Sequence, residues 1–365
     1  MSALATLIDA ALRDPAAAAR RANSSGQRVI GFVGTDVPVE LIAAAGAFPW
    51  RLPAAADTPT GRADAYLEAS FQPQERAIAE QWLSGAFDFI DEVVFTRAND
   101  SIQRLYYYLC ELQRRKLCAG PAPLLFDLCK IPRASSALRT RAVTASLSDS
   151  LGSRIDELPR CIRGRNRRRE LLLQLQQRRG QSAAPAGSFI ERLARASDCC
   201  AAHEFDSALT HWLEQPTRAA SGPRLILAGS TPPDDRLHRA VERAGGNIIA
   251  ELGDHALGRL GATIEGGSDP IAALSLHYHA LRNGPRAFGD ATAALLEAVR
   301  ITHADGVIFW LLEQEEALAW DLPAQRRALD GVALPSLQLL HRRWNADDGA
   351  LDEIRDFIGA HWRTA

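Results

Sequence analysis

The chain has 365 residues and a mass of 39.7 kDa, a length that predicts two domains and excludes a single small module. With 47% hydrophobic and 24% charged residues, the composition is that of a folded globular protein and excludes a largely disordered chain. The 42 basic and 44 acidic residues give a formal net charge of -2, so the whole molecule has no general attraction to nucleic acid or to an anionic membrane.

Residues 1–26 are predicted to form an amphipathic surface helix rather than a secretion signal, because the stretch has no basic start and carries Asp9, Arg13 and Asp14. No run reaches the roughly 18 apolar residues that span a bilayer. We therefore expect a cytoplasmic protein without membrane association. In that reducing compartment its six cysteines are thiols or ligands rather than disulfides.

Short apolar runs bounded by turn residues alternate with longer helical patterns along the chain, which is typical of βαβ units around a parallel sheet. This pattern predicts an α/β fold. The predicted strands are residues 28–33, 92–97, 123–128, 224–228, 247–252, 306–312 and 334–339.

A helical stretch without strands separates the third predicted strand from the fourth. It covers residues 144–218 and contains a flexible connector of small residues at 180–187. We place the domain boundary after it, which predicts an N-terminal α/β domain with a helical, arginine-rich segment over residues 1–220 and a C-terminal α/β domain over 221–365.

Three predicted helix starts carry polar residues suited to a binding site. Gln72 precedes a helix that begins with proline, Asn99 and Asp100 follow the second strand, and Glu315 lies in an acidic turn after the strand 306–312. In open α/β sheets, ligands bind beyond the carboxyl ends of the strands, where helix N-termini present free N–H groups. The alternative is that all three positions only cap helices.

Cys129 and Lys130 follow the carboxyl end of the third predicted strand. We predict that the nearby ammonium group lowers the pKa of the Cys129 thiol, which would make it a candidate functional residue. The alternative for this cysteine, as for the other five, is a small buried hydrophobic side chain.

Gly229, Ser230 and Thr231 follow the fourth predicted strand, just before a helix. Backbone N–H groups in this position suit an anionic group, and a CoA-like or acyl ligand is the candidate. A nucleotide triphosphate is not supported, because the segment has neither the spaced glycines of a dinucleotide fingerprint nor a Walker lysine.

Residues 31–49 (GFVGTDVPVELIAAAGAFP) resemble the opening of the 2-hydroxyacyl-CoA dehydratase and benzoyl-CoA reductase family, and specifically of its D-component-like subunits. The family opening has a Gly-aromatic strand followed by Val-Pro-x-Glu-Leu-Ile-x-Ala-Ala-Gly-x-x-Pro. The resemblance continues through Phe71-Gln72-Pro73-x-x-Arg76, Asn99-Asp100-Ser101, and the segments 225–230, 245–249 and 305–308, and so covers nearly the whole chain. It implies two Rossmann- or flavodoxin-like domains with short parallel sheets that face each other across a cleft.

Members of that family hold a [4Fe-4S] cluster with three cysteines, and this sequence departs from the pattern. Gln72, Asn99 and Glu315 stand at the positions that match the cluster cysteines. Fe–S clusters are held by thiolates, which amides and a single carboxylate do not replace. We therefore expect no metal or cluster bound by this chain's own residues, and a [4Fe-4S] cluster only in a partner subunit.

The expected cleft and substrate set combines positions from the resemblance with positions at predicted strand ends, and the catalytic residues stay unassigned. This set is Arg76, Asp100, Ser101, Cys129, Lys130, Gly229, Ser230 and Thr231. The dense basic segment 160–169 has no interleaved aromatic residues, so we expect it to serve the structure or a CoA phosphate rather than nucleic acid.

The family's activity is radical acyl-CoA dehydration or aryl-CoA reduction, which makes this chain's own catalytic competence the open question. The first hypothesis is a cluster-free companion subunit, a pseudoenzyme that pairs with a cysteine-bearing paralogue or with itself and contributes architecture and part of an acyl-CoA pocket. The second is a stand-alone acyl-CoA-binding or regulatory protein. The third is an active dehydratase-like enzyme with atypical Fe–S ligands, Glu315 and Cys129 among them.

Overall fold

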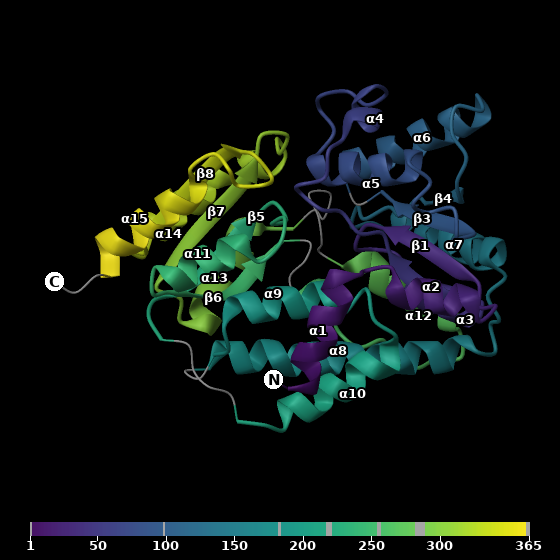
Figure 1. Cartoon of the computed structure of the whole chain (residues 1–365). Coiled ribbons are helices and arrows are strands. Elements are labelled where there is room, and N and C mark those ends of the chain that lie inside the picture. Colours follow the sequence, from purple (N-terminus) through teal and green to yellow (C-terminus); the bar gives the residue numbers. More distant parts are fainter. Residues whose placement is uncertain are drawn as a thin grey trace.

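The computed structural model describes residues 2–97, 99–181, 184–216, 221–253, 257–281 and 289–362. Within these residues the chain forms two four-stranded parallel sheets flanked by helices, which confirms the predicted α/β fold. Figure 1 shows the two sheets in two separate lobes, with further helices beneath them. In the described part of the chain, no helix combines the length and the apolar character needed to cross a membrane.

The first lobe is built on a sheet with the strand order β2-β1-β3-β4. Its strands are β1 (Val29–Val33), β2 (Phe48–Arg51), β3 (Glu92–Thr96) and β4 (Ala122–Phe126). Its helices are α2 (Ala17–Ser24), α3 (Val39–Ala44), α4 (Gly61–Asp64), α5 (Pro73–Leu83), α6 (Asp100–Arg114) and α7 (Ala134–Leu151).

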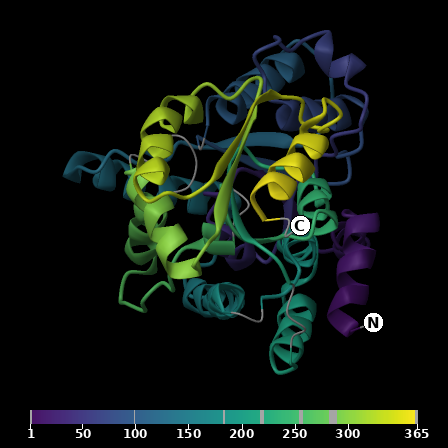
Figure 2. The ribbon, with the colours of Figure 1, turned by 90° about the vertical axis from the view of Figure 1, so that its left-hand side faces the viewer.

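The second lobe repeats the same arrangement in the order β6-β5-β7-β8. Its strands are β5 (Arg224–Gly229), β6 (Asn247–Leu252), β7 (Gly306–Leu312) and β8 (Ser336–Arg342). Its helices are α11 (Arg236–Arg243), α13 (Ala291–Thr302), η2 (Leu318–Trp320), α14 (Leu322–Gly331) and α15 (Ala350–Trp362), which lie on both faces of the sheet (Figure 2).

The remaining helices include those that join the two lobes. They are α1 (Ala3–Arg13), α8 (Leu158–Gly180), α9 (Gly187–Ala196), α10 (Ala202–Leu213), η1 (Leu257–Leu260) and α12 (Pro270–Ala280). The long helix α8 contacts α3 in the first lobe and β6 in the second, and Figure 1 shows it beneath both. As predicted, the N-terminal stretch is helical and amphipathic, since α1 buries Leu4, Ile8 and Ala11.

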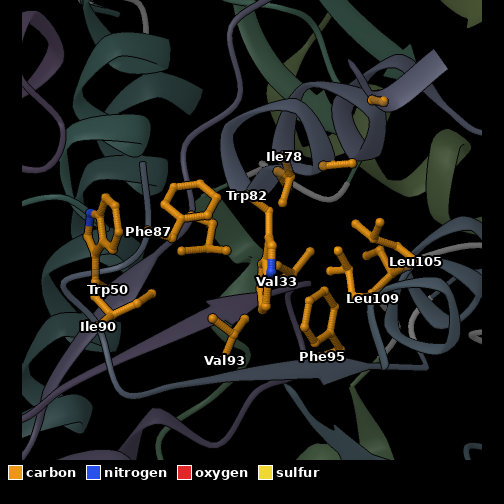
Figure 3. Close-up of a cluster of buried hydrophobic side chains, with 14 of the residues drawn as sticks. Val33, Trp50, Ile78, Trp82, Phe87, Ile90, Val93, Phe95, Leu105 and Leu109 are labelled. Carbon is orange, nitrogen blue, oxygen red and sulfur yellow. The ribbon is translucent and has the colours of Figure 1, made fainter. Parts of the chain in front are cut away.

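Successive side chains along a β-strand point to opposite faces of the sheet, so each strand contributes residues to the cores on both faces. In β7, Ile308 and Trp310 pack with α11 and α15, whereas Val307 and Phe309 pack with α13 and α14 on the opposite face. Figure 3 shows the corresponding core on one face of the first sheet, where Trp82 is 2% exposed.

The chain does not divide cleanly at the predicted boundary. That boundary separates the two sheets, but α12 comes from the C-terminal part and packs against α7 in the first lobe. Leu274 and Tyr278 of α12 join the core that contains Ile30 and Phe126 of the first sheet. The first lobe therefore contains chain from both sides of residue 220.

Candidate functional site

A cavity of about 650 Å³ lies between the lobes, at the carboxyl ends of the strands. In the first sheet the chain passes from β1 to β2 on one side and then to β3 on the other side of β1, and in the second sheet it passes from β5 to β6 and then to β7 in the same way. The point between β1 and β3, and likewise between β5 and β7, is therefore a topological switch point, where α/β sheets bind ligands. Residues after all four of these strands line the cavity: Gly34 and Thr35, Asn99, Gly229 to Thr231, and Glu315.

The structure brings together the three positions that match the family's cluster cysteines. Gln72, Asn99 and Glu315 all line the cavity, although Glu315 comes from the second lobe. The Gln72 side-chain Nε2 donates a hydrogen bond across the cavity to Glu315 Oε2 at 3.1 Å. Gln72, Asn99 and Glu315 therefore line one cavity although they come from two lobes.

Two of the three residues, Gln72 and Asn99, also stand at helix starts. Gln72 is the N-cap residue of α5, and its backbone N–H donates to Ser101 Oγ at 3.0 Å. Asn99 caps α6, and its Oδ1 accepts a hydrogen bond from the Ile102 N–H at 2.7 Å. The capping role and the site role are thus compatible, since the same residues cap helices and line the cavity.

Glu315 carries the only carboxyl group among these three positions, and its pKa is perturbed. Burial raises its pKa above the usual value, and hydrogen bonds from the backbone of Leu318 and from Gln72 only partly oppose this. The Leu318 N–H donates to Glu315 Oε1 at 3.3 Å. The neutral carboxylic acid is therefore favoured relative to an exposed glutamate.

The cavity residues do not fit an Fe–S cluster. All six cysteines lie in the described part of the chain, and none of them lines the cavity. In the described residues, no group of three or more histidines, cysteines, aspartates or glutamates is placed to hold a metal ion. Since thiolates are the ligands that hold such clusters, the side chains that line this cavity are unsuited to one.

Gly229, Ser230 and Thr231 line the cavity as expected, but the Ser230 backbone amide is already used. Its N–H donates to the Trp310 carbonyl at 2.7 Å, and its Oγ accepts from the Leu312 N–H at 3.2 Å. The expectation that this backbone receives an anionic group therefore does not hold for the Ser230 N–H.

The remaining predicted residues of the first lobe lie outside the cavity lining. Arg76 forms an ion pair with Asp64, Asp100 is exposed, and Ser101 supports Gln72 from behind. The resemblance places these residues next to a cluster ligand in sequence. In the structure, however, a helix turns successive side chains to different sides.

Cys129 and Lys130 also lie outside the cavity lining. The pKa of the Cys129 thiol is lowered, as predicted, but the cause is a hydrogen bond with Ser136 (3.3 Å), aided by nearby arginines. Lys130 Nζ instead pairs with the buried Asp36 carboxylate at 2.9 Å. The attribution of the shift to Lys130 was wrong, because adjacent residues at a strand end point to different sides.

The sequence reasoning missed four charged residues that line the cavity: Arg51, Arg179, Glu251 and Arg259. Arg179 of α8 donates two hydrogen bonds to Glu251 of β6, at 2.6 Å and 2.8 Å. Burial opposes ionisation of Glu251, but Arg179 and His238 lower its pKa to about 2. Arg51 Nε and Arg259 Nη2 both form ion pairs with Asp198 Oδ2, at 2.9 Å and 3.2 Å.

One sequence signal did point to Glu251, since this residue lies near the carboxyl end of a predicted strand. No comparable signal marks Arg179, which comes from the far end of a long arginine-rich helix. Arg179 reaches the cavity because α8 passes from one lobe to the other, and the order of residues in the sequence does not predict that path.

The arginine-rich segment is largely structural. Arg169 Nη2 pairs with Glu40 Oε1 at 2.7 Å, and the Tyr278 hydroxyl donates to Glu40 Oε2 at 2.9 Å. Arg168 pairs with Asp206 and donates to the Ser197 carbonyl at 2.8 Å. These contacts support the structural interpretation of the segment, and they give Glu40 of the opening motif a role in holding α3 to α8 and α12.

Comparison with known proteins agrees with the fold and with the sequence motifs. The family model described as 2-hydroxyglutaryl-CoA dehydratase, D-component, matches residues 35–352, a range that runs from before β2 to the first turn of α15. A search of curated proteins found no match to the chain. Because the family model covers most of the chain, the chain belongs to the 2-hydroxyglutaryl-CoA dehydratase D-component family.

Proposed function

We propose that this protein is a cluster-free companion subunit that binds an acyl-CoA thioester in the interlobe cavity beside a cysteine-bearing paralogue. The observation that carries the proposal is the meeting of Gln72, Asn99 and Glu315 at one cavity, with two amides and a carboxyl group where the family resemblance expects thiolates. The family description names a component of a dehydratase, which supports a partner subunit.

The lining chemistry supports a ligand that is partly polar and partly apolar. Amide side chains of Gln72, Gln74 and Gln325 face the same cavity as the apolar Ile102 and Leu322. Uncharged hydrogen-bond donors suit a thioester carbonyl, and the apolar residues suit its acyl chain. A volume of about 650 Å³ lies within the usual range for small-molecule sites.

The paired charges of the cavity wall support binding rather than electron transfer. Arg179 is neutralised by Glu251 within the wall, and the elevated pKa of Glu315, which burial causes, favours an uncharged hydrogen-bonding group there. In this proposal the wall fixes the shape of the pocket. Gln72 and Glu315 supply hydrogen bonds to the ligand by exchanging their mutual bond for bonds to it.

The first experiment measures iron and acid-labile sulfide per chain, with a visible spectrum, on protein purified without oxygen. We expect iron near zero, because no cysteine lines the cavity. About four irons per chain would refute the cluster-free interpretation and would restore the hypothesis of an enzyme with atypical ligands.

The second experiment measures acyl-CoA binding by calorimetry and uses a matched pair of variants on α13. Ala294 lines the cavity, whereas its neighbour Ala293 is exposed and does not. We expect Ala294→Trp to abolish the binding of a short-chain acyl-CoA and Ala293→Trp to keep it. Equal binding by both variants would place the ligand elsewhere.

Co-purification decides between the companion subunit and the stand-alone binding protein. The chain is co-expressed with a tagged, cysteine-bearing member of the family, and capture of both in a fixed ratio is the expected result. Acyl-CoA binding without any association would favour the stand-alone binding protein.

A further inference from the structure

A second cavity of about 420 Å³ lies where α2, β2 and α8 meet the segment 197–204. It shares no lining residue with the interlobe cavity. Its lining includes the apolar residues Phe32, Val39 and Phe48 together with Arg165 and Arg168.

Arg165 differs from the arginines around it on α8. Arg168 and Arg169 are buried and each forms an ion pair. The buried Nε of Arg165 has no hydrogen-bond partner, and among the described residues its guanidinium forms no ion pair within 4.0 Å. A buried donor without a partner costs free energy, so a protein that keeps one at a cavity wall calls for an explanation.

The Asp198 and Glu40 carboxylates lie near enough to Arg165 to favour its charged form, but neither forms an ion pair with it. Asp198, which also lines this cavity, is already shared by Arg51 and Arg259. Arg168 is paired with Asp206. These carboxylates are thus committed to other arginines, and none lies within ion-pair distance of Arg165 among the described residues.

Burial lowers the pKa of Arg165 to about 10, and the neighbouring positive charge of Arg168 adds to the effect. The guanidinium therefore stays charged at neutral pH. An anion bound beside it would relieve both effects, because an opposite charge favours the charged form of arginine.

We propose that this cavity binds a small organic monocarboxylate, whose carboxylate pairs with Arg165 and whose apolar body packs on Phe32 and Phe48. The planar guanidinium matches a carboxylate with two parallel hydrogen bonds. One unpaired cation calls for one negative charge, and the apolar wall that the phenylalanines form in the same cavity calls for a hydrocarbon body. Inorganic phosphate would satisfy the cation but leave this wall without a contact.

The test is calorimetric titration of the full chain with sodium benzoate and sodium hexanoate, with inorganic phosphate and benzamide as comparison ligands. We expect saturable binding of the carboxylates, and weaker or no binding of phosphate and of the uncharged amide. Phosphate binding as tight as benzoate would overturn the assignment to an organic carboxylate, and the absence of carboxylate binding would overturn the site itself.

Arg165→Met keeps an unbranched apolar side chain but removes the guanidinium group and its charge. The matched control is Arg163→Met, an exposed position on the same helix. We expect at least a tenfold loss of benzoate affinity in Arg165→Met and unchanged affinity in Arg163→Met, since charge-assisted hydrogen bonds have strengths of this order. Equal affinity in both variants would refute the role of Arg165.

Thermal unfolding without ligand separates this site from a purely structural arginine. A structural role predicts that Arg165→Met unfolds at a lower temperature than the wild type. A binding site that keeps an unpaired charge predicts an equal or higher unfolding temperature, because the variant no longer buries that charge. If Arg165→Met does not fold, Arg165→Gln gives the same comparison with a polar side chain.

Discussion

Glu251→Gln tests whether the ion pair between α8 and the second sheet stabilises the fold. Glu251 accepts two hydrogen bonds from Arg179 and lies 3.1 Å from His238 Nε2. The substitution keeps the size of the side chain and removes its charge, so Arg179 loses its partner within the cavity wall. We expect a clear loss of stability at neutral pH.

The magnitude follows from the pKa of Glu251, which Arg179 and His238 lower from 4.5 to about 2 against the opposing effect of burial. At about 1.4 kcal/mol for each tenfold change in the ionisation constant, this gap corresponds to about 3 kcal/mol. Because the pKa is lower in the folded state, this stabilisation is present above pH 4.5 and is lost as the pH falls toward 2.

The assay is urea unfolding of the wild type and of Glu251→Gln between pH 7 and pH 3, followed by circular dichroism and tryptophan fluorescence. The difference in the free energy of unfolding should be about 3 kcal/mol at pH 7 and less than half of that at pH 3. The control is Glu297→Gln, which removes an exposed pair with Arg300 on α13 and should have little effect. A difference that does not change with pH, or one no larger than in the control, would refute the reasoning.

Three further predictions concern the cavity and the cores. Burial raises the pKa of Glu315, so its ionisation above pH 4.5 opposes folding. Glu315→Gln should therefore raise the melting temperature at pH 7 and change it little at pH 4. An unchanged or lower melting temperature at pH 7 would contradict this. Gly229 has φ +115, and a Cβ there would lie 2.4 Å from the Trp310 carbonyl oxygen, so Gly229→Ala should lower the melting temperature. Gly245→Ala should lower it less, because the space around Gly245 is open. Trp82→Ala should lower the free energy of unfolding in urea by about 3–5 kcal/mol, since the side chain is 2% exposed within the core of the first lobe. Trp320 is exposed, and a loss no larger than that of Trp320→Ala would show that this core is not as described.

Most strands could be predicted because their apolar runs are continuous and bounded by turn residues. All seven predicted strands are present, with ends that differ by at most three residues. The strand that escaped prediction, β2, contains Pro49, and a proline in a sequence is evidence against a strand. Pro49 is tolerated because β2 is the edge strand and pairs only with β1.

The candidate site was predictable only in part. The three positions came from the predicted strand ends and helix starts and then from the family resemblance, and the structure shows that they share one cavity. The direction of the pKa shift of Cys129 was predictable from its surroundings at a strand end, but its cause was not. The partner of Lys130 is Asp36, which lies on a loop far away in the sequence.

Packing of α12 against the first lobe was not predictable either. Its buried side chains, Leu274 and Tyr278, would satisfy a core in either lobe by their apolar character alone. Polar contacts with distant segments help to fix the choice. Tyr278 donates to Glu40, which also pairs with Arg169, and Asp269 at the start of α12 pairs with Arg141 of α7 at 2.6 Å.

The path of α12 also limits how the gene for this protein can be recombined. A chimaera that takes residues 1–220 from this chain and the remainder from a paralogue would receive a foreign α12 for its first-lobe core and a foreign partner for Glu40. Exchange of the two halves between relatives is therefore a poor route to new specificity. A graft that moves residues 257–281 together with the first lobe preserves Leu274, Tyr278 and their contacts, and is the unit that recombination between paralogues should transfer.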